Sequence, residues 1–179
     1  MLEIDKTCLV VVDVQGKLAE LMWEKESLFK NIEILVKSAN ILDMPILWCQ
    51  QYPKALGDTI EQVAAHLQDI SPCDKMSFSC CGNEEFADKL HAAGCRQLLI
   101  CGIEAHICVY QTAMDMLDMD YDVQVVGDAV SSRTQENKDA ALSRIKWEGA
   151  AITTTEMALF ELLGTAEHEK FREIAKLVK

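Results

Sequence analysis

The chain has 179 residues, half of them hydrophobic, and a formal net charge of −12 at pH 7. This length fits one domain with a substantial buried core, so we expect a single domain over residues 1–179. The acidic charge and the absence of a Lys/Arg cluster argue against a phosphate-backbone ligand, so no nucleic-acid partner is expected.

The sequence also disfavours a membrane-spanning protein and a secreted protein. No apolar run approaches the roughly 18 residues of a membrane span, and the first residues lack the basic and apolar regions of a signal peptide. We therefore expect a cytoplasmic protein without a membrane partner.

The eight cysteines are expected to be reduced thiols, because such a chain does not need a disulfide framework. Four of them lie in or beside expected strands and are interpreted as small core hydrophobes: Cys8, Cys49, Cys95 and Cys101.

Strand and helix patterns alternate along the chain. In chain order we expect a strand over 7–12, a helix over 28–42, a strand over 45–49, a short strand at or beside Lys75, a helix over 84–93, a strand over 97–101, a helix over 106–118, a strand over 122–126, a helix over 135–147, a short strand over 150–153, and helices over 155–163 and 167–177. Asn83 is the expected N-cap of the helix over 84–93, and Gly94 ends it.

The alternation predicts a three-layer α/β/α fold with a mostly parallel, doubly wound, Rossmann-like sheet of about six strands. Ligands of such sheets bind in the crevice outside the carboxyl ends of the strands. The polar residues expected at that edge are Asp13, Gln50, Gln51, Cys108, Asp128, Ser131, Ser132 and Arg133.

Cys108 follows the apolar run 97–101 and Gly102, at the expected start of a helix. The free N–H groups and positive dipole end of a helix favour a thiolate there. Asp13 directly follows four apolar residues, where a carboxylate is costly without a partner or a task. Each residue also has a plain alternative: a core cysteine for Cys108, a helix N-cap or a partner of a structural cation for Asp13, and a solvated side chain for Lys75.

Three motifs stand in order along the chain: Val12-Asp13-Val14-Gln15, Lys75 followed by Phe78-Ser79, and Gly102-Ile103-Glu104 followed by Cys108 and Thr112. With them the chain resembles the isochorismatase-like cysteine hydrolases over nearly its whole length. Two further stretches are similar to the branch called isochorismatase domain-containing proteins: Gln50-Gln51-Tyr52-Pro53-Lys54-Ala55-Leu56-Gly57 and Asp128-Ala129-Val130-Ser131-Ser132-Arg133.

The resemblance implies a catalytic triad of Asp13, Lys75 and Cys108. Asp13 would take the thiol proton and later give it to the leaving amine, while Lys75 would hold Asp13 as a carboxylate. Cys108 would form a thioester with a small amide-like substrate, or one with a related C–N bond. The family's cis peptide maps onto Ile103-Glu104, and the N–H groups of Glu104 and Cys108 would form the oxyanion hole.

The chain also departs from parts of this family. Nicotinamidases carry an Asp-x-His and a further His near the end of the second strand, where this chain has Gln50-Gln51-Tyr52-Pro53. We therefore expect no metal and no cofactor, and nicotinamide is disfavoured as the substrate. True isochorismatases cleave a vinyl ether and lack the nucleophilic cysteine, so Cys108 argues against that reaction, which stays an alternative.

The loops around the expected site supply candidate specificity residues. Gln51 and Tyr52 are expected to bind the substrate, and Gln15 to bind the substrate or brace Asp13. Arg133 is expected either to bind a substrate carboxylate or to pair with one of the many acids. His106 is not expected to act with Cys108, because residues two positions apart on a helix do not face each other.

Three questions stay open at this level. A homo-oligomer is expected from the resemblance, and the Met-rich segment 114–119 could be its surface or part of the core. A non-catalytic binding or scaffolding protein that keeps the triad is an alternative function. A thiol redox sensor that uses Cys80-Cys81 or Cys108 is another.

Overall fold

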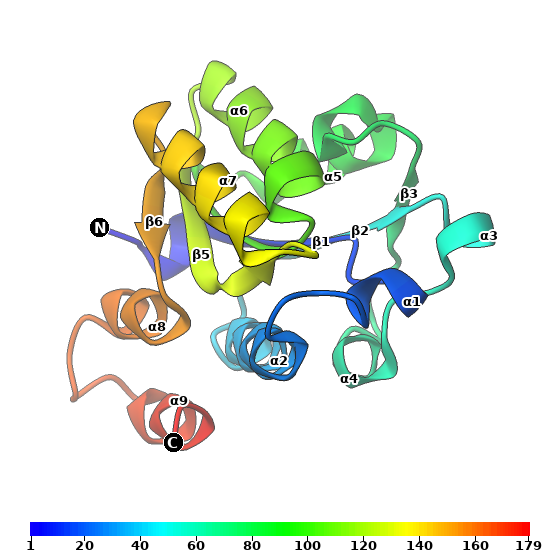
Figure 1. The fold of residues 1–179 in the computed structure, drawn as a ribbon. Coiled ribbons are helices and arrows are strands. Elements are labelled where there is room, and N and C mark those ends of the chain that lie inside the picture. The colour runs from blue at the N-terminus through cyan, green and yellow to red at the C-terminus, as the bar shows by residue number, and fades with distance from the viewer.

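A computed structural model describes the chain from Met1 to Lys179. Its six strands form one sheet in the order β3-β2-β1-β4-β5-β6, and every neighbouring pair is parallel. Helices cover both faces of this sheet (Figure 1), so the expected three-layer, doubly wound α/β/α class is confirmed. The strands are β1 (Thr7–Val12), β2 (Ile46–Gln51), β3 (Cys73–Lys75), β4 (Gln97–Ile103), β5 (Asp122–Ser131) and β6 (Ala151–Thr153).

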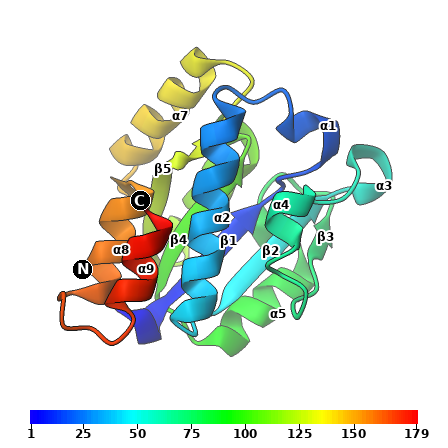
Figure 2. The same cartoon turned by 90° about the horizontal axis from the view of Figure 1, so that it is seen from below.

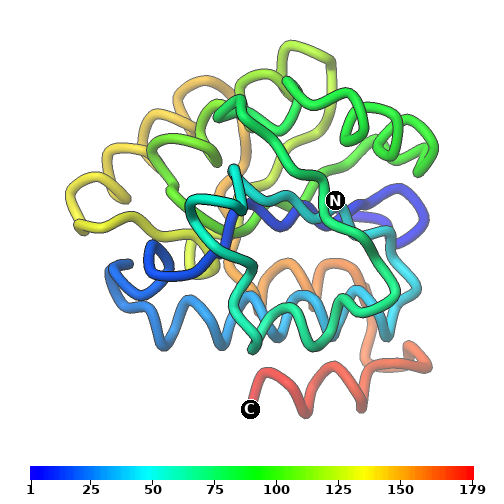
Figure 3. The backbone as a smooth tube through the Cα atoms, turned by 90° about the vertical axis from the view of Figure 1, so that its right-hand side faces the viewer, coloured from blue at the N-terminus to red at the C-terminus, as the bar shows by residue number.

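The long helices divide between the two faces. Three of them lie on one face: α2 (Lys25–Ile41), α8 (Thr155–Leu163) and α9 (Phe171–Leu177). Three lie on the other: α5 (Glu84–Ala93), α6 (Tyr110–Asp118) and α7 (Gln135–Trp147). Figure 3 shows the strands between the two helical layers, and Figure 2 shows α2 crossing the sheet with α8 and α9 beside it. None of the helices combines the length and apolar character required to cross a membrane.

The central strand β1 explains why the chain forms three layers. All six of its residues are buried, and successive side chains of a strand point to opposite faces. Leu9 and Val11 pack in the core cluster that contains residues of α2 and α8, whereas Val10 and Val12 pack in the cluster with α5, α6 and α7. A strand buried on both faces has a continuous apolar sequence, which is the pattern that predicted it.

Several elements differ from the sequence prediction in their bounds. The strand expected over 122–126 continues to Ser131, with an irregular register against β4. The helix expected over 106–118 begins with a π-helical turn, so α6 starts only at Tyr110. The last helix begins at Phe171, later than expected. Short segments also occur that are only one turn long, too short to show helical periodicity: η1 (Ile4–Lys6), α1 (Gly16–Ala19), α3 (Pro53–Leu56), α4 (Glu61–Ala64) and η2 (Cys80–Gly82).

Gly102 allows β4 to pass close to the end of β1. Its φ is +117°, and a Cβ at this position would lie 2.1 Å from the backbone oxygen of Val12. No other residue fits there without moving the backbone, because side chains rarely adopt this φ and cannot overlap a carbonyl. The glycine thus fixes the path of the chain that leads from β4 to Cys108.

The eight cysteines are all free thiols. Cys8, Cys49, Cys95 and Cys101 are buried in the sheet region, so their interpretation as core residues is confirmed. Cys81 is the one cysteine that is only partly buried.

Candidate active site

The carboxyl ends of three strands bring the predicted triad together. Asp13 is the first residue after β1, and Lys75 is the last residue of β3. Cys108 lies in the π-helical turn η3 (Ala105–Val109), which directly follows β4. Asp13 has a positive φ of 51°, an uncommon conformation for a residue with a side chain. The triad therefore lies at the carboxyl ends of the strands, where ligands of parallel α/β folds bind.

The ammonium group of Lys75 is buried and surrounded by hydrogen-bond acceptors. Its Nζ lies 2.6 Å from Asp13 Oδ2, and the two side chains are 0% and 3% exposed. The same ammonium donates to Gln51 Oε1 at 2.8 Å and to the Phe78 carbonyl at 2.9 Å. Burial acts to lower the pKa of Lys75, but the Asp13 carboxylate, together with the neighbouring Cys80 and Cys108, raises it above its ordinary value. Lys75 is therefore a permanent cation beside Asp13.

Asp13 keeps one carboxylate oxygen free of hydrogen bonds. Its Oδ1 is buried without a partner, and such a group is costly unless it has a task. Burial raises the pKa of Asp13, although Lys75 and the neighbouring Cys108 thiol act in the opposite direction. Cys108 and Asp13 also line the same cavity. Oδ1 is thus the acceptor available for the Cys108 proton.

Cys108 is a thiol in this site, not a thiolate. Burial, reinforced by the charge of Asp13, raises its pKa to about 12, while Lys75 acts to lower it. The expectation that a helix start favours the thiolate is corrected here, because Cys108 lies in a buried π-helical turn and faces a carboxylate. A thiol in this state needs a base before it can act as a nucleophile.

Glu104 begins the turn that carries Cys108. The peptide bond between Ile103 and Glu104 is cis. The Glu104 carbonyl accepts hydrogen bonds from the N–H groups of Ile107 and Val109 at 3.0 and 3.2 Å, whereas its own N–H donates to no backbone carbonyl. This N–H, at the entrance to η3, is therefore available to a ligand oxygen.

Arg133 pairs with the Glu104 side chain. Its backbone N–H and its Nε both donate to Glu104 Oε2 at 3.1 Å. The guanidinium is half exposed while Glu104 is buried. Of the two expectations for Arg133, the pairing with an acid of the chain is the one observed.

A cavity of about 110 Å³ opens above Cys108 and Asp13. Its remaining polar lining comes from Gln51 and Glu104. The apolar lining comes from Leu18, Leu56, Phe78, Ile103 and Ile107. Sequence reasoning did not identify these apolar residues as cavity walls, although Leu56, Phe78 and Ile103 belong to the stretches that carry the resemblance.

Gln51 and Gln15 have different roles. Gln51 lines the cavity and bridges Lys75 to the Met76 carbonyl, to which its Nε2 donates at 2.9 Å. Gln15 is fully buried, and its amide bonds only backbone: Oε1 accepts from Gln51 N–H, and Nε2 donates to the carbonyls of Gln51 and Gly57. Gln15 thus braces the loop after β2, in place of Asp13, and it does not line the cavity at Cys108.

Tyr52 and His106 lie outside the cavity at Cys108. Tyr52 is 45% exposed and lines a neighbouring depression of about 210 Å³, whose other lining residues are Pro53, Lys54, Asp74, Lys75 and Met76. The prediction that Tyr52 binds the substrate therefore does not extend to the cavity at Cys108. His106 contacts Ser132 Oγ through Nδ1 at 2.9 Å, which agrees with its exclusion as a partner of Cys108.

Other polar residues of this sheet edge hold loops in place. Asp128 Oδ1 accepts hydrogen bonds from the N–H and hydroxyl of Thr155 at 2.8 and 2.9 Å. Ser131 Oγ donates to the Trp23 carbonyl at 2.6 Å. Thr112 Oγ1 accepts from the Cys80 N–H at 3.0 Å, which anchors the segment between Lys75 and α5 on α6.

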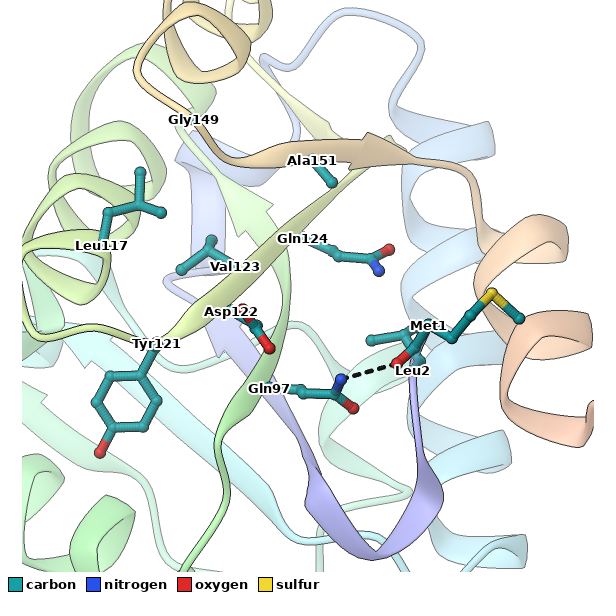
Figure 4. Close-up of a pocket in the computed structure, with 10 residues that line it drawn as sticks. All are labelled: Met1, Leu2, Gln97, Leu117, Tyr121, Asp122, Val123, Gln124, Gly149 and Ala151. Atoms are coloured by element: carbon teal, nitrogen blue, oxygen red, sulfur yellow. Dashed lines mark hydrogen bonds between the residues drawn. The ribbon is translucent and has the colours of Figure 1, made fainter.

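A larger cavity, of about 270 Å³, lies at the opposite end of the sheet (Figure 4). It is lined by Met1, Leu2, Gln97, Leu117, Tyr121, Asp122, Val123, Gln124, Gly149 and Ala151. The Gln97 side chain holds the N-terminal segment in place there, because its Nε2 donates a hydrogen bond to the Met1 carbonyl at 2.8 Å. None of the predicted site residues reaches this cavity.

No group of three or more His, Cys, Asp or Glu side chains is arranged to hold a metal ion. The end of β2, where the sequence departs from the nicotinamidase pattern of metal-binding residues, is occupied by Gln50 and Gln51. Gln50 donates from Nε2 to Thr59 Oγ1 at 2.9 Å. The residues present at this position therefore do not fit the metal site of that branch.

Comparison with known proteins identifies the family of the chain. The chain matches the family model of the isochorismatase domain over residues 7–157. It is 38% identical to the secreted isochorismatase effector Isc1 of Phytophthora sojae, over 96% of this chain and 83% of that protein. It is 40% identical to isochorismatase domain-containing protein 2 of Xenopus laevis, over 80% of this chain and 69% of that protein.

Two solved structures share the fold. The MAR1 ribonuclease from Caenorhabditis elegans superposes with a TM-score of 0.93 at 34% identity, over 99% of this chain and 91% of that one. The YcaC gene product of Escherichia coli, described as an octameric hydrolase of unknown specificity, gives 0.93 at 23% identity, over 98% and 88%. Together with the matched domain, these relatives show that the chain belongs to the isochorismatase family of hydrolases.

Proposed function

We propose that the chain is a cysteine hydrolase that cleaves a small amide-like substrate, or one with a related C–N bond, with Asp13, Lys75 and Cys108 as its triad. The observation that carries the proposal is the buried Asp13–Lys75 ion pair next to the Cys108 thiol, with Asp13 Oδ1 left without a hydrogen bond. A buried carboxylate with a raised pKa next to a thiol is suited to general-base catalysis.

In the first half-reaction, Cys108 Sγ attacks the substrate carbonyl while its proton moves to Asp13 Oδ1. The carbonyl oxygen becomes an oxyanion, which accepts hydrogen bonds from the N–H groups of Glu104 and Cys108. The tetrahedral intermediate then collapses: the C–N bond breaks, Asp13 returns the proton to the nitrogen, and the amine leaves. A thioester to Cys108 remains.

In the second half-reaction, water attacks the thioester and gives its proton to Asp13. The C–S bond then breaks, the acid product leaves, and the proton returns to Cys108. Lys75 keeps the same hydrogen bond to Asp13 Oδ2 throughout and reserves Oδ1 for proton transfer. One carboxylate therefore serves as base and acid in turn.

Hydrolysis of RNA is a less favoured activity, although one relative with 34% identity is described as a ribonuclease. The net charge of −12 opposes a polyphosphate ligand. Both cations next to the cavity, Lys75 and Arg133, are already paired with carboxylates. We also favour catalysis over a non-catalytic scaffold, because a scaffold does not need an unsatisfied buried carboxylate oxygen.

The proposal also covers the substrate, the oligomeric state and the cellular location of the enzyme. We expect a small-molecule substrate, a homo-oligomer and a cytoplasmic location. An octameric protein with the same fold supports the oligomer, whereas a relative described as secreted leaves the location as a prediction. In the Met-rich segment, Met116 is buried, Met114 is partly buried and Met119 is 55% exposed, so the segment is divided between core and surface.

The test is a panel of small amides, ureas and carbamoyl compounds, with ammonia or amine release as the readout. Wild type and Cys81→Ala should hydrolyse the same members of the panel at similar rates. Cys108→Ala should lose activity by roughly a thousandfold or more, because the nucleophile is gone. Turnover by Cys108→Ala at the wild-type rate would rule out the nucleophile assignment.

A further inference from the structure

The cavity at Cys108 is small. Its volume of about 110 Å³ is below the roughly 150 Å³ of a protein cavity that holds benzene, so it accommodates about four or five non-hydrogen atoms. Acetamide and propionamide have this size. Any substrate whose reacting carbonyl reaches Cys108 must therefore place only a short acyl group inside the cavity.

The walls around that acyl group are mainly carbon. Leu18 comes from α1, Leu56 from α3 and Ile107 from η3, and the half-exposed ring of Phe78 completes the apolar wall together with Ile103. Both ends of the Gln51 amide already have partners, in the Lys75 ammonium and the Met76 carbonyl. The walls thus offer an acyl group apolar contact in place of polar recognition.

The charges around the cavity exclude anions. Two carboxylates, those of Asp13 and Glu104, line it. The corresponding cations are both paired, Lys75 with Asp13 at 2.6 Å and Arg133 through Nε with Glu104 at 3.1 Å, and neither of them lines the cavity. A carboxylate on the acyl group would be desolvated next to two negative charges without a free cation, which costs several kcal/mol.

We infer that this cavity selects short, uncharged, apolar acyl groups, so that the substrate is a neutral amide whose acyl part has about two to four carbon atoms. The inference rests on the proposed cysteine hydrolase and narrows it to one substrate class. It also separates this chain from the reactions of its family that act on carboxylate-bearing compounds. Leu56 and Phe78 are its specificity residues.

Charge selection is tested with two amides of the same shape. Isobutyramide and oxamate fit the inferred size limit and have the same shape, but a branched dimethyl end in the first replaces the carboxylate of the second. Ammonia release should give a kcat/KM at least about a hundredfold higher for isobutyramide, because only oxamate must bury a charge. Equal values for the two amides, or a preference for oxamate, would overturn the inference.

Length selection is tested with the linear series from acetamide to hexanamide. For wild type, kcat/KM should peak at two to four acyl carbons and fall at least about tenfold by hexanamide. Leu56→Ala and Phe78→Ala should move the peak to a longer chain, since each removes part of the wall. Leu21→Ala is the matched control, because Leu21 is 62% exposed and does not line the cavity; its profile should equal that of wild type. A wild-type rate that keeps rising to hexanamide would contradict the inference.

A measurement without turnover distinguishes failure of this inference from failure of the proposed function. Iodoacetamide and iodoacetate have the same length and differ in charge, and both alkylate a thiol by forming an S–C bond, expelling iodide and releasing the thiol proton. The rate ratio of iodoacetamide to iodoacetate at Cys108, followed by peptide mass spectrometry, should exceed the ratio for free glutathione at least about tenfold.

Amide hydrolysis and the alkylation ratio together distinguish the proposed function from the selectivity of the cavity. If no amide is hydrolysed but the alkylation ratio is raised, the proposed function fails and the selectivity of the cavity stands. If the ratio equals that of glutathione, the selectivity fails whatever the turnover. If Cys108 reacts with neither reagent, the selectivity also fails, because the inference requires that a small neutral amide reaches the thiol.

Discussion

Lys75 Nζ lies 2.6 Å from Asp13 Oδ2, in a position where neither side chain is more than 3% exposed. Each charge is stable there only because the other is present, since an unpaired charge in such surroundings loses its hydration without compensation. The pair joins β1 to the sheet-edge strand β3. It also orients Asp13 so that Oδ1 remains for Cys108.

Removing the cation should destabilise the fold. Lys75→Met keeps the length of the side chain but leaves Asp13 as an unpaired buried carboxylate, and the free energy of unfolding should fall by about 3–5 kcal/mol. Urea unfolding followed by circular dichroism measures it. The double variant Asp13→Asn/Lys75→Met should recover part of the loss, because no unpaired charge then remains. Two single losses that simply add in the double variant would contradict the coupling.

Asp13 should determine the acid limb of activity. As pH falls, Asp13 gains a proton and can no longer accept one from Cys108, so kcat/KM decreases through the pKa of Asp13. Burial raises that pKa above the ordinary 3.8, so the decrease should begin at a higher pH than for an exposed aspartate. On the alkaline side, the raised pKa of Lys75 keeps it charged up to at least pH 10.5. A pH–rate profile whose acid limb lies below pH 3.8 would be inconsistent with this role.

Asp13→Asn should separate the base from the nucleophile. Asparagine keeps the shape of the side chain but cannot take the thiol proton, and loss of a general base costs about 10²- to 10⁴-fold in kcat/KM. Alkylation of Cys108 by iodoacetamide should slow as well, while that of Cys81 is unchanged. If Cys108 reacts at the same rate in both proteins, Asp13 is not its base.

Gln15 should act on stability and not on specificity. Gln15→Ala removes the acceptor of Gln51 N–H and a donor to the Gly57 carbonyl, and each buried polar group left without a partner costs about 1–3 kcal/mol. The melting temperature should fall, while the order of kcat/KM values across an amide series stays that of wild type. A changed order with unchanged stability would restore Gln15 as a substrate contact.

Gly102 should tolerate no side chain. Gly102→Ala would place a Cβ 2.1 Å from the Val12 carbonyl oxygen at a φ of +117°, so β4 must move away from β1. We expect a lower melting temperature together with loss of activity, because the same movement displaces Glu104 and Cys108. Gly94→Ala is a milder reference, since a Cβ there meets nothing within 4 Å. Equal effects of the two substitutions would contradict the close approach at Gly102.

The fold could be predicted because its strands and helices are each encoded by patterns of neighbouring residues. Apolar runs such as 7–12 and 97–101 announce buried parallel strands, and Asn83 accepts the Phe86 N–H at 2.8 Å as the predicted N-cap. The parallel direction of the strands followed from their alternation with helices, whereas their order in the sheet was not predicted. The positions of the three candidate catalytic residues followed from motifs and from the rule that function lies at the carboxyl ends of strands.

The remaining features depend on contacts between distant segments. The thiol state of Cys108 is set by burial and by Asp13, which belongs to another strand, so the local helix argument predicted the wrong protonation. Gln15 and Tyr52 both follow strands in the sequence, but one turns inward to brace a loop and the other lies outside the cavity. The wall residues Leu18 and Leu56 lie in helices of a single turn, which leave no periodic pattern.

The most direct test of the account is the mass of the enzyme during turnover. Wild-type protein mixed with a short neutral amide and quenched in acid should carry one acyl group, located by peptide mass spectrometry on Cys108 and removed by hydroxylamine as expected of a thioester. Cys108→Ala should carry none and should release no ammonia, while Cys81→Ala should behave as wild type. Ammonia release by Cys108→Ala at the wild-type rate, or an acyl group found on another residue, would contradict the account.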